Sequence, residues 1–113
     1  MKNLIFVCCF YLFSLTLHAE ETITIVRGNG NYFPLEYVEN GKLTGIHIEL
    51  IQTVADELGL TVKFDSLPWT RALHYFKRGK FDAMSHVSLT DDRETFAHFL
   101  PGNIISSVKT YPI

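Results

Sequence analysis

One segment of this chain indicates its architecture: Gly79-Lys-Phe-Asp-Ala-Met-Ser-His-Val-Ser-Leu-Thr-Asp-Asp-Arg93. Gly79 predicts a tight turn, and residues 81–84 predict a short buried strand because they are mostly apolar. Thr90 is a good N-cap for a helix whose first turn carries two aspartates, which complement the helix dipole. The segment therefore predicts a turn, a strand, a polar loop and a helix start in direct succession.

The polar part of this segment suits an anionic ligand. Arg93 offers a planar fork of N–H donors, and Ser85, Ser88 and Thr90 offer hydroxyl groups beside backbone N–H groups. A small carboxylate is the ligand that these donors suit best. The alternative is a strand–turn–helix whose arginine is only solvated, because a single arginine near a helix start is common.

Strands and helices are predicted to alternate along the chain, which indicates an α/β fold with a mainly parallel sheet flanked by helices. Ligands of such sheets collect beyond the carboxyl ends of the strands, where residues 29–32, 68–69 and 85–90 should converge. The predicted strands cover residues 22–26, 61–64, 81–84 and 104–111, a hairpin turns at Asn40-Gly41, and helices cover residues 46–58 and 69–78.

The helix over residues 46–58 has the clearest pattern. Its apolar residues recur at helical spacing, and Gly59 supplies a stop. The residues that share this apolar face are Ile46, Leu50, Ile51, Val54, Ala55 and Leu58.

Residues 1–19 have the features of a cleaved secretory signal peptide. Lys2 supplies the positive start, an apolar run follows over residues 4–17, and Ala19 ends an acceptable cleavage site. A retained membrane anchor is the alternative, but the apolar run is short for a span of about 20 residues. Both cysteines, Cys8 and Cys9, lie in this leader, so the mature chain would have no disulfide, thiolate metal site or cysteine nucleophile.

Composition and motifs exclude several other functions. The net charge is −2 with acids and bases interspersed, so nucleic acid is not an expected partner. Gly28-Asn-Gly30 lacks the rest of a dinucleotide fingerprint. His47-Ile-Glu49 resembles the start of a zinc deaminase motif, but its cysteine partners are missing, which favours a solvated helix start. We therefore expect no metal and no cofactor.

Five features, in this order and spacing, carry a family resemblance: Tyr32-Phe-Pro-Leu-Glu-Tyr37, Asn40-Gly-Lys-Leu-Thr-Gly45, the amphipathic helix over residues 46–58, Pro68-Trp69 and Gly79-Lys-Phe-Asp-Ala83. With them, residues 22–113 resemble the N-terminal half of the bacterial extracellular solute-binding proteins of family 3. The resemblance implies that residues 20–113 form an incomplete periplasmic binding protein-like lobe, truncated before the second lobe. The chain would then be a fragment, or a partner would supply the rest.

The resemblance also implies a ligand site. Arg93 matches the arginine that clamps a carboxylate, Ser88 and Thr90 match positions beside it, and Ser85 with His86 would line the adjoining wall. Tyr32 and Trp69 match aromatic positions that sandwich the ligand, with core packing as the alternative. Asn29 stands where some relatives place an acid that binds a basic ligand. The predicted ligand-binding residues are Asn29, Tyr32, Trp69, Ser85, His86, Ser88, Thr90 and Arg93.

Two departures from the family pattern affect the expected ligand. His47 replaces a common aspartate, and His86 is bulkier than the usual small residue. The implied function is periplasmic binding of an amino acid for uptake through a membrane ABC permease. The alternatives are a sensor-kinase input domain, the N-terminal domain of a lytic transglycosylase, or a cyclohexadienyl dehydratase, for which only His86 is a plausible proton donor.

Overall fold

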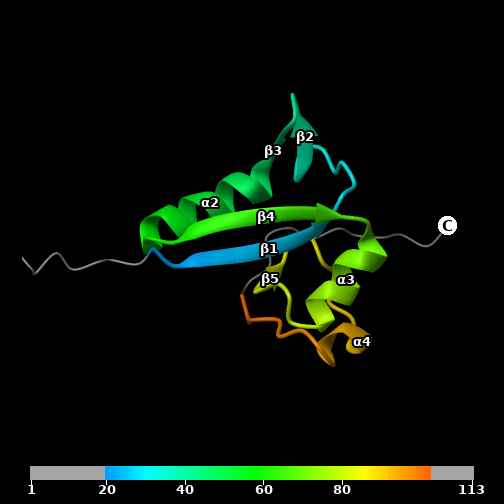
Figure 1. Ribbon diagram of the computed structural model, residues 1–113. Helices are drawn as coiled ribbons and strands as arrows, with labels where there is room; N and C mark the ends of the chain where they lie inside the picture. Colours follow the sequence, from blue (N-terminus) through cyan, green and yellow to red (C-terminus); the bar gives the residue numbers. More distant parts are fainter. Residues whose placement is uncertain (1–19, 103–113) are drawn as a thin grey trace, which may run out of the picture.

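A computed structural model describes residues 20–102 of the chain (Figure 1). The predicted signal peptide over residues 1–19 and the predicted strand over residues 104–111 lie outside the described residues. Among the helices of the described part, none has the length and apolar character needed to cross a membrane.

A parallel three-stranded sheet forms the centre of the fold, as the alternation of elements predicted. Strand β1 (Thr22–Gly28) lies between β4 (Thr61–Leu67) and β5 (Ala83–Met84). The pairing of β1 with β4 runs without a break from Thr22↔Thr61 to Gly28↔Leu67, so β4 extends three residues beyond its predicted end. β5 is shorter than predicted, because only its two residues pair with β1.

The predicted hairpin is formed by β2 (Tyr37–Glu39) and β3 (Lys42–Thr44). Asn40 and Gly41 both adopt positive φ angles, 51° and 73°. A two-residue hairpin turn requires such angles to match the right-handed twist of the strands that it joins. The hairpin leads directly into α2 (Ile46–Leu58), which ends at Gly59 in the left-handed conformation, as predicted.

The apolar face of α2 is only partly covered. Of the six residues predicted to form this face only Ala55 is buried, and four at a spacing of four remain largely exposed. The other buried residues of the helix, His47 and Ile48, lie outside the predicted set. Within the described residues α2 packs mainly on β3 and β4. The exposed residues are Ile46, Leu50, Val54 and Leu58.

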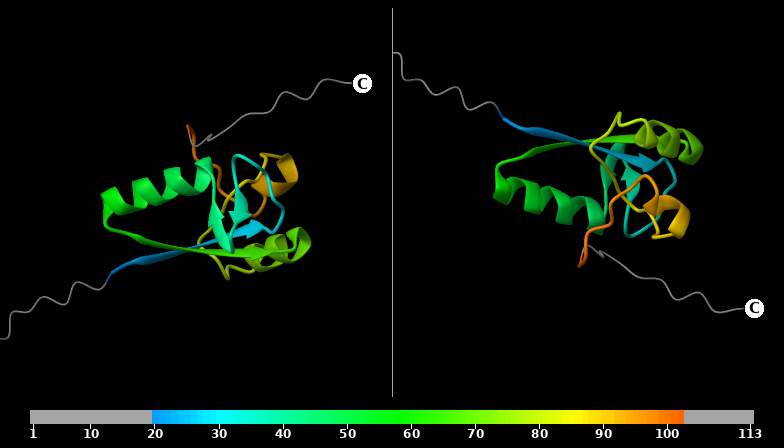
Figure 2. Two further views of the ribbon diagram at one scale, coloured as in Figure 1. Left: turned by 90° about the horizontal axis from the view of Figure 1, so that it is seen from above. Right: turned by 90° about the horizontal axis from the view of Figure 1, so that it is seen from below.

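Two further helices follow the carboxyl ends of β4 and β5. Helix α3 (Trp69–Lys77) buries Ala72 toward the sheet, and α4 (Asp91–Glu94) starts at Thr90. Figure 1 places α2 and the hairpin on one side of the β1/β4 ribbon and α3 on the other. Figure 2 shows α2 running alongside this ribbon and α3 at its carboxyl end. The carboxyl end of β1 is thus surrounded by the hairpin, α3 and the segment after β5.

Candidate functional site

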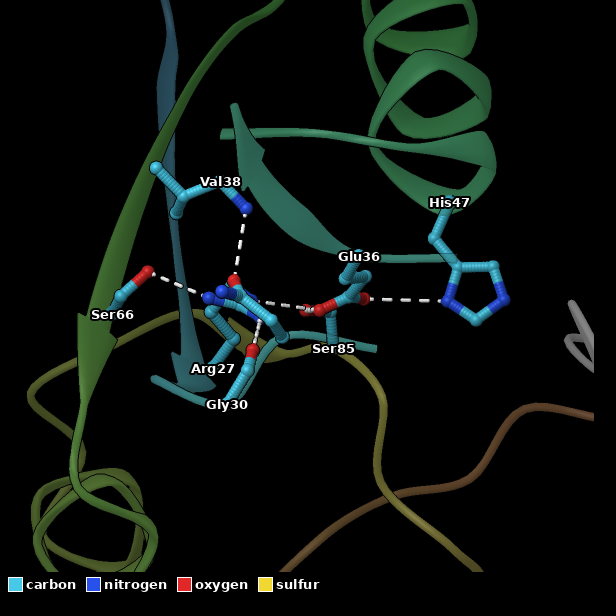
Figure 3. Close-up of polar contacts among 8 residues, drawn as sticks. Arg27, Gly30, Glu36, Val38, His47, Ser66 and Ser85 are labelled. Atoms are coloured by element: carbon cyan, nitrogen blue, oxygen red, sulfur yellow. Dashed lines mark hydrogen bonds and ion pairs between the residues drawn. The ribbon is translucent and has the colours of Figure 1, made fainter. Parts of the chain in front are cut away.

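A buried ion pair lies at the carboxyl end of β1 (Figure 3). Arg27 and Glu36 both have 0 % exposure, and Arg27 Nε donates to Glu36 Oε2 at 2.8 Å. The other guanidinium nitrogens donate to Ser66 Oγ at 2.9 Å and to the Gly30 carbonyl at 2.6 Å. The buried guanidinium is therefore fully paired, which a charge in this environment requires.

Glu36 also connects the pair to two other segments. Its Oε1 lies 3.3 Å from Nδ1 of His47 on α2, and its Oε2 accepts from Ser85 Oγ, just after β5, at 3.3 Å. We call Arg27, Glu36, His47 and Ser85 the inner network. It joins β1, the hairpin segment, α2 and the end of β5, and so fixes the backbone around the carboxyl edge of the sheet.

The inner network corrects the sequence analysis in two respects. His47 was predicted to lie at a solvated helix start, but it is buried because it packs against the Glu36 carboxylate. Arg27 and Glu36 were not predicted as important at all. The available signal was a charged residue within the otherwise apolar and β-branched strand β1, which must find a partner if the strand is central.

Tyr32 and His86 form a stacked pair outside the inner network. Their ring centroids are 4.4 Å apart, and His86 adopts a positive φ of 53°. Tyr32 lies over Gly30, where an added Cβ would approach the Tyr32 hydroxyl to 2.6 Å. The absence of a side chain at Gly30 therefore lets the Tyr32 ring fold over the end of β1.

Trp69 and Arg93 form a second pair at the same edge. Trp69 lies against Gly28, where an added Cβ would be 3.1 Å from Cε3 of the indole. The guanidinium carbon of Arg93 lies 5.1 Å from the Trp69 ring centroid, and Nη1 donates to the Ser88 carbonyl at 2.9 Å. Arg93 makes no ion pair with a carboxylate of residues 20–102.

Most of the predicted site residues are therefore brought to one edge of the sheet. The Thr90 hydroxyl is the N-cap of α4 and accepts from the Arg93 N–H at 3.3 Å, so it fixes the start of that helix. Ser85 differs from the others, since it is buried and its hydroxyl points inward to Glu36. We call the remaining set the rim: Asn29, Tyr32, Trp69, His86, Ser88, Thr90 and Arg93.

One group in the described residues could offer ligands to a metal ion. Single atoms of Glu36, His47 and His86 lie within 4.8 Å of one another. The guanidinium of Arg27 already occupies Glu36 Oε2, however, and its positive charge opposes a second cation at this carboxylate. The geometry is better explained as an ion-paired network than as a metal centre.

Asp82 has a separate, structural role. Its Oδ2 accepts from the backbone N–H of Thr24 at 2.9 Å and from the Thr24 hydroxyl at 3.0 Å. These two hydrogen bonds, the backbone one first, lower the pKa of the Asp82 carboxyl below its usual value. Asp82 therefore anchors the segment just before β5 to Thr24 of β1.

Residues 24–109 match the family of bacterial extracellular solute-binding proteins, family 3. The chain belongs to this family. It is 30% identical over 81 residues to the "Probable amino-acid-binding protein YxeM" of Bacillus subtilis, and 28% identical over 103 residues to a cyclohexadienyl dehydratase of Pseudomonas aeruginosa. The unliganded L-cystine solute receptor of Neisseria gonorrhoeae shares its fold with a TM-score of 0.58 and 32% identity.

These similarities cover only part of each relative. The matched regions span 71% of this chain and 31% of the Bacillus protein, 81% and 38% for the dehydratase, and 67% and 33% for the cystine receptor. The chain thus spans about a third of the length of these relatives. The predicted family and the periplasmic binding protein fold are both confirmed, and relatives with this fold include binding proteins as well as an enzyme.

Proposed function

We propose that this chain binds the carboxylate of a small solute, an amino acid, at the rim and serves its uptake through an ABC transporter. One observation carries the proposal. Arg93 lies at the carboxyl edge of the sheet, against Trp69, with no carboxylate partner among residues 20–102. Amino-acid-binding relatives such as the Bacillus protein support the choice of ligand class.

The surroundings of Arg93 suit a carboxylate. The side-chain hydrogen bond to the Ser88 carbonyl and the packing on the indole orient the guanidinium. Its other N–H donors have no acceptor among residues 20–102 and so can serve a ligand. The Thr90 cap holds the backbone that carries the arginine. A planar guanidinium positioned in this way can bind a carboxylate through two parallel hydrogen bonds.

The aromatic residues of the rim would contact the rest of the solute. Tyr32, stacked on His86, and Trp69 lie over the two glycines that end β1 and follow it. Asn29 is exposed in the turn between those glycines and carries no charge, which disfavours a ligand with a cationic side chain. We therefore favour an amino acid without a positive side chain.

The proposed affinity is weak for this chain alone. Relatives about three times as long would enclose the ligand between two lobes, and only one lobe corresponds to the matched region. We expect a millimolar dissociation constant, equivalent to roughly 4 kcal/mol. Secretion through residues 1–19 into the periplasm and docking to a membrane permease belong to the same proposal.

A titration followed by NMR tests the proposal directly. Amino acids are added to the ¹⁵N-labelled chain, and we expect chemical-shift changes at the Trp69 indole and at the backbone amides of residues 88–93. Arg93→Lys keeps the charge but loses the paired geometry, so it should weaken the response. No shifts at these positions with any amino acid would refute the proposal. Micromolar affinity of this chain would refute the expectation that one lobe alone binds the amino acid weakly.

The dehydratase relative favours one alternative, an enzyme acting on a cyclohexadienyl acid. His86 would then be the proton donor, because it is the histidine stacked on Tyr32 at the rim. Turnover of such a substrate by this chain or a longer protein containing it, lost in His86→Ala, would replace the binding proposal. Amino-acid binding without turnover of such a substrate would support the binding proposal.

A further inference from the structure

Four of the ten lysine and arginine residues of this chain lie within residues 71–80, although the chain as a whole has a net charge of −2. No aspartate or glutamate lies within that segment. The cations are Arg71, Lys77, Arg78 and Lys80. Positive charge is thus concentrated on α3 and the turn that follows it, although acids and bases are interspersed over most of the chain.

The structure gathers most of this charge around one open hollow on α3. Arg71, His74, Tyr75 and Arg78 follow helical spacing and share one face of the helix, and Lys80 reaches the same hollow from the following turn. No carboxylate of residues 20–102 lines the hollow. Its lining residues, which we call the basic face, are Pro68, Thr70, Arg71, His74, Tyr75, Arg78 and Lys80.

The charges of the basic face are not neutralised within the described chain. No lysine or arginine of residues 71–80 forms an ion pair with a carboxylate of residues 20–102. Lys80 instead lies 4.8 Å from the Tyr75 ring centroid, and the neighbouring Lys77 lies 4.5 Å from that of Phe96. Aromatic rings hold these ammonium groups in place without cancelling their charge.

We propose that the basic face binds the surface of a bilayer containing anionic phospholipids. A membrane surface presents many phosphate groups at once and attracts clustered lysine and arginine residues without a fitted pocket. The hollow is open, and among its lining residues in the described part of the chain only Pro68 and Tyr75 could contribute apolar contact. A protein partner would need a buried apolar anchor. Such binding would hold the solute-binding rim near the membrane, which goes beyond the proposed ligand site.

Vesicle co-sedimentation with the 113-residue chain tests this inference. We compare vesicles of phosphatidylcholine alone with vesicles that also contain phosphatidylglycerol, at low and high salt. The charge-reversal variant Arg71→Glu/Arg78→Glu is matched by Lys42→Glu/Lys63→Glu, which makes the same change in net charge at exposed lysines outside the basic face. The apolar leader contributes equally to all variants, so differences between them report on α3.

We expect the wild-type chain to prefer anionic vesicles and to lose that preference at high salt. The Arg71/Arg78 variant should bind anionic vesicles at least about tenfold more weakly than the Lys42/Lys63 variant. Circular dichroism and the amino-acid titration should be unchanged in both. Equal binding by the two variants, no preference for anionic lipid, or saturation by free pyrophosphate without vesicle binding would each overturn the inference.

Discussion

The inner network and the rim lie at the same end of β1, yet their arginines differ in burial and in hydrogen bonding. Arg27 is fully buried, and each of its guanidinium nitrogens donates to a protein acceptor. Arg93 is half-buried, and within residues 20–102 its side chain donates to one carbonyl, that of Ser88. The comparison teaches that the number of bonds already satisfied, rather than the residue type, separates a structural arginine from one that can serve a ligand.

Breaking the inner network should have the largest effect. Arg27→Met leaves the Glu36 carboxylate buried without its cation, which should lower the free energy of unfolding by ~3–5 kcal/mol. Urea unfolding followed by circular dichroism measures the change. Lys63→Met, at an exposed lysine on the neighbouring strand β4, is the matched control and should change stability little.

A double variant keeps this prediction testable if the single variant does not fold. Arg27→Met/Glu36→Leu removes both charges and should be more stable than Arg27→Met alone, because no unpaired charge stays buried. If Arg27→Met instead lowers the free energy of unfolding by no more than the Lys63→Met control, the ion pair does not hold together the four segments joined by the inner network. The contrast with the rim would then fail.

The rim arginine should show the opposite pattern. In a two-lobed protein containing this chain, Arg93→Ala should weaken binding of the solute by ~2–4 kcal/mol, because it removes a charge-assisted pair from a desolvated cleft. Unfolding should barely change, since Arg93 makes one side-chain hydrogen bond. Calorimetry and urea unfolding on the same samples separate the two effects. Lost stability with retained affinity would make Arg93 a structural residue.

How far the sequence could predict these regions depends on how local their determinants are. The hairpin at Asn40-Gly41, the bounds of α2 and the Thr90 cap follow from neighbouring residues, and all three are confirmed. The convergence of the rim follows from a general rule for parallel sheets. Local patterns and topology therefore sufficed for most of the fold and for the placement of the rim.

The inner network depends on contacts between distant segments, which local patterns do not encode. Glu36 and Ser85 meet only after the hairpin and β5 pack together. The neighbours Ser85 and His86 were predicted to line one wall, but Ser85 points inward while His86 stacks on Tyr32. A buried hydroxyl and an outward ring are decided by tertiary packing, so sequence reasoning assigned both to the same surface.

A smaller effect is expected at Gly30, over which the Tyr32 ring of the rim packs. Gly30→Ala places a Cβ against the Tyr32 hydroxyl, so the Tyr32 ring should move away from His86 at a cost of ~1–2 kcal/mol in stability. Thermal unfolding and the ring-current shifts of the His86 protons measure both effects. In a Tyr32→Ala background the same Gly30→Ala change should cost little, and an equal cost there would show that the ring is not what Gly30 accommodates.

The smallest effect is expected at Asp82, where a polar contact lies in solvent at the far end of the sheet. Hydrogen bonds from Thr24 lower its pKa, so the folded chain favours the ionised form more than the unfolded chain does. Asp82 therefore contributes stability above its unfolded pKa, and that contribution is lost as the pH falls through the lower folded pKa. Asp82→Asn should thus be less stable than the wild type near neutral pH, and the difference should shrink in acid. Urea unfolding at several pH values measures it, with Asp65→Asn, an exposed carboxylate on β4, as the control. A stability difference between Asp82→Asn and the wild type that stays constant with pH would show that the Thr24 contacts do not depend on the charge of Asp82. A loss of stability as large as that of Arg27→Met would contradict the distinction between buried and solvated polar contacts in this fold.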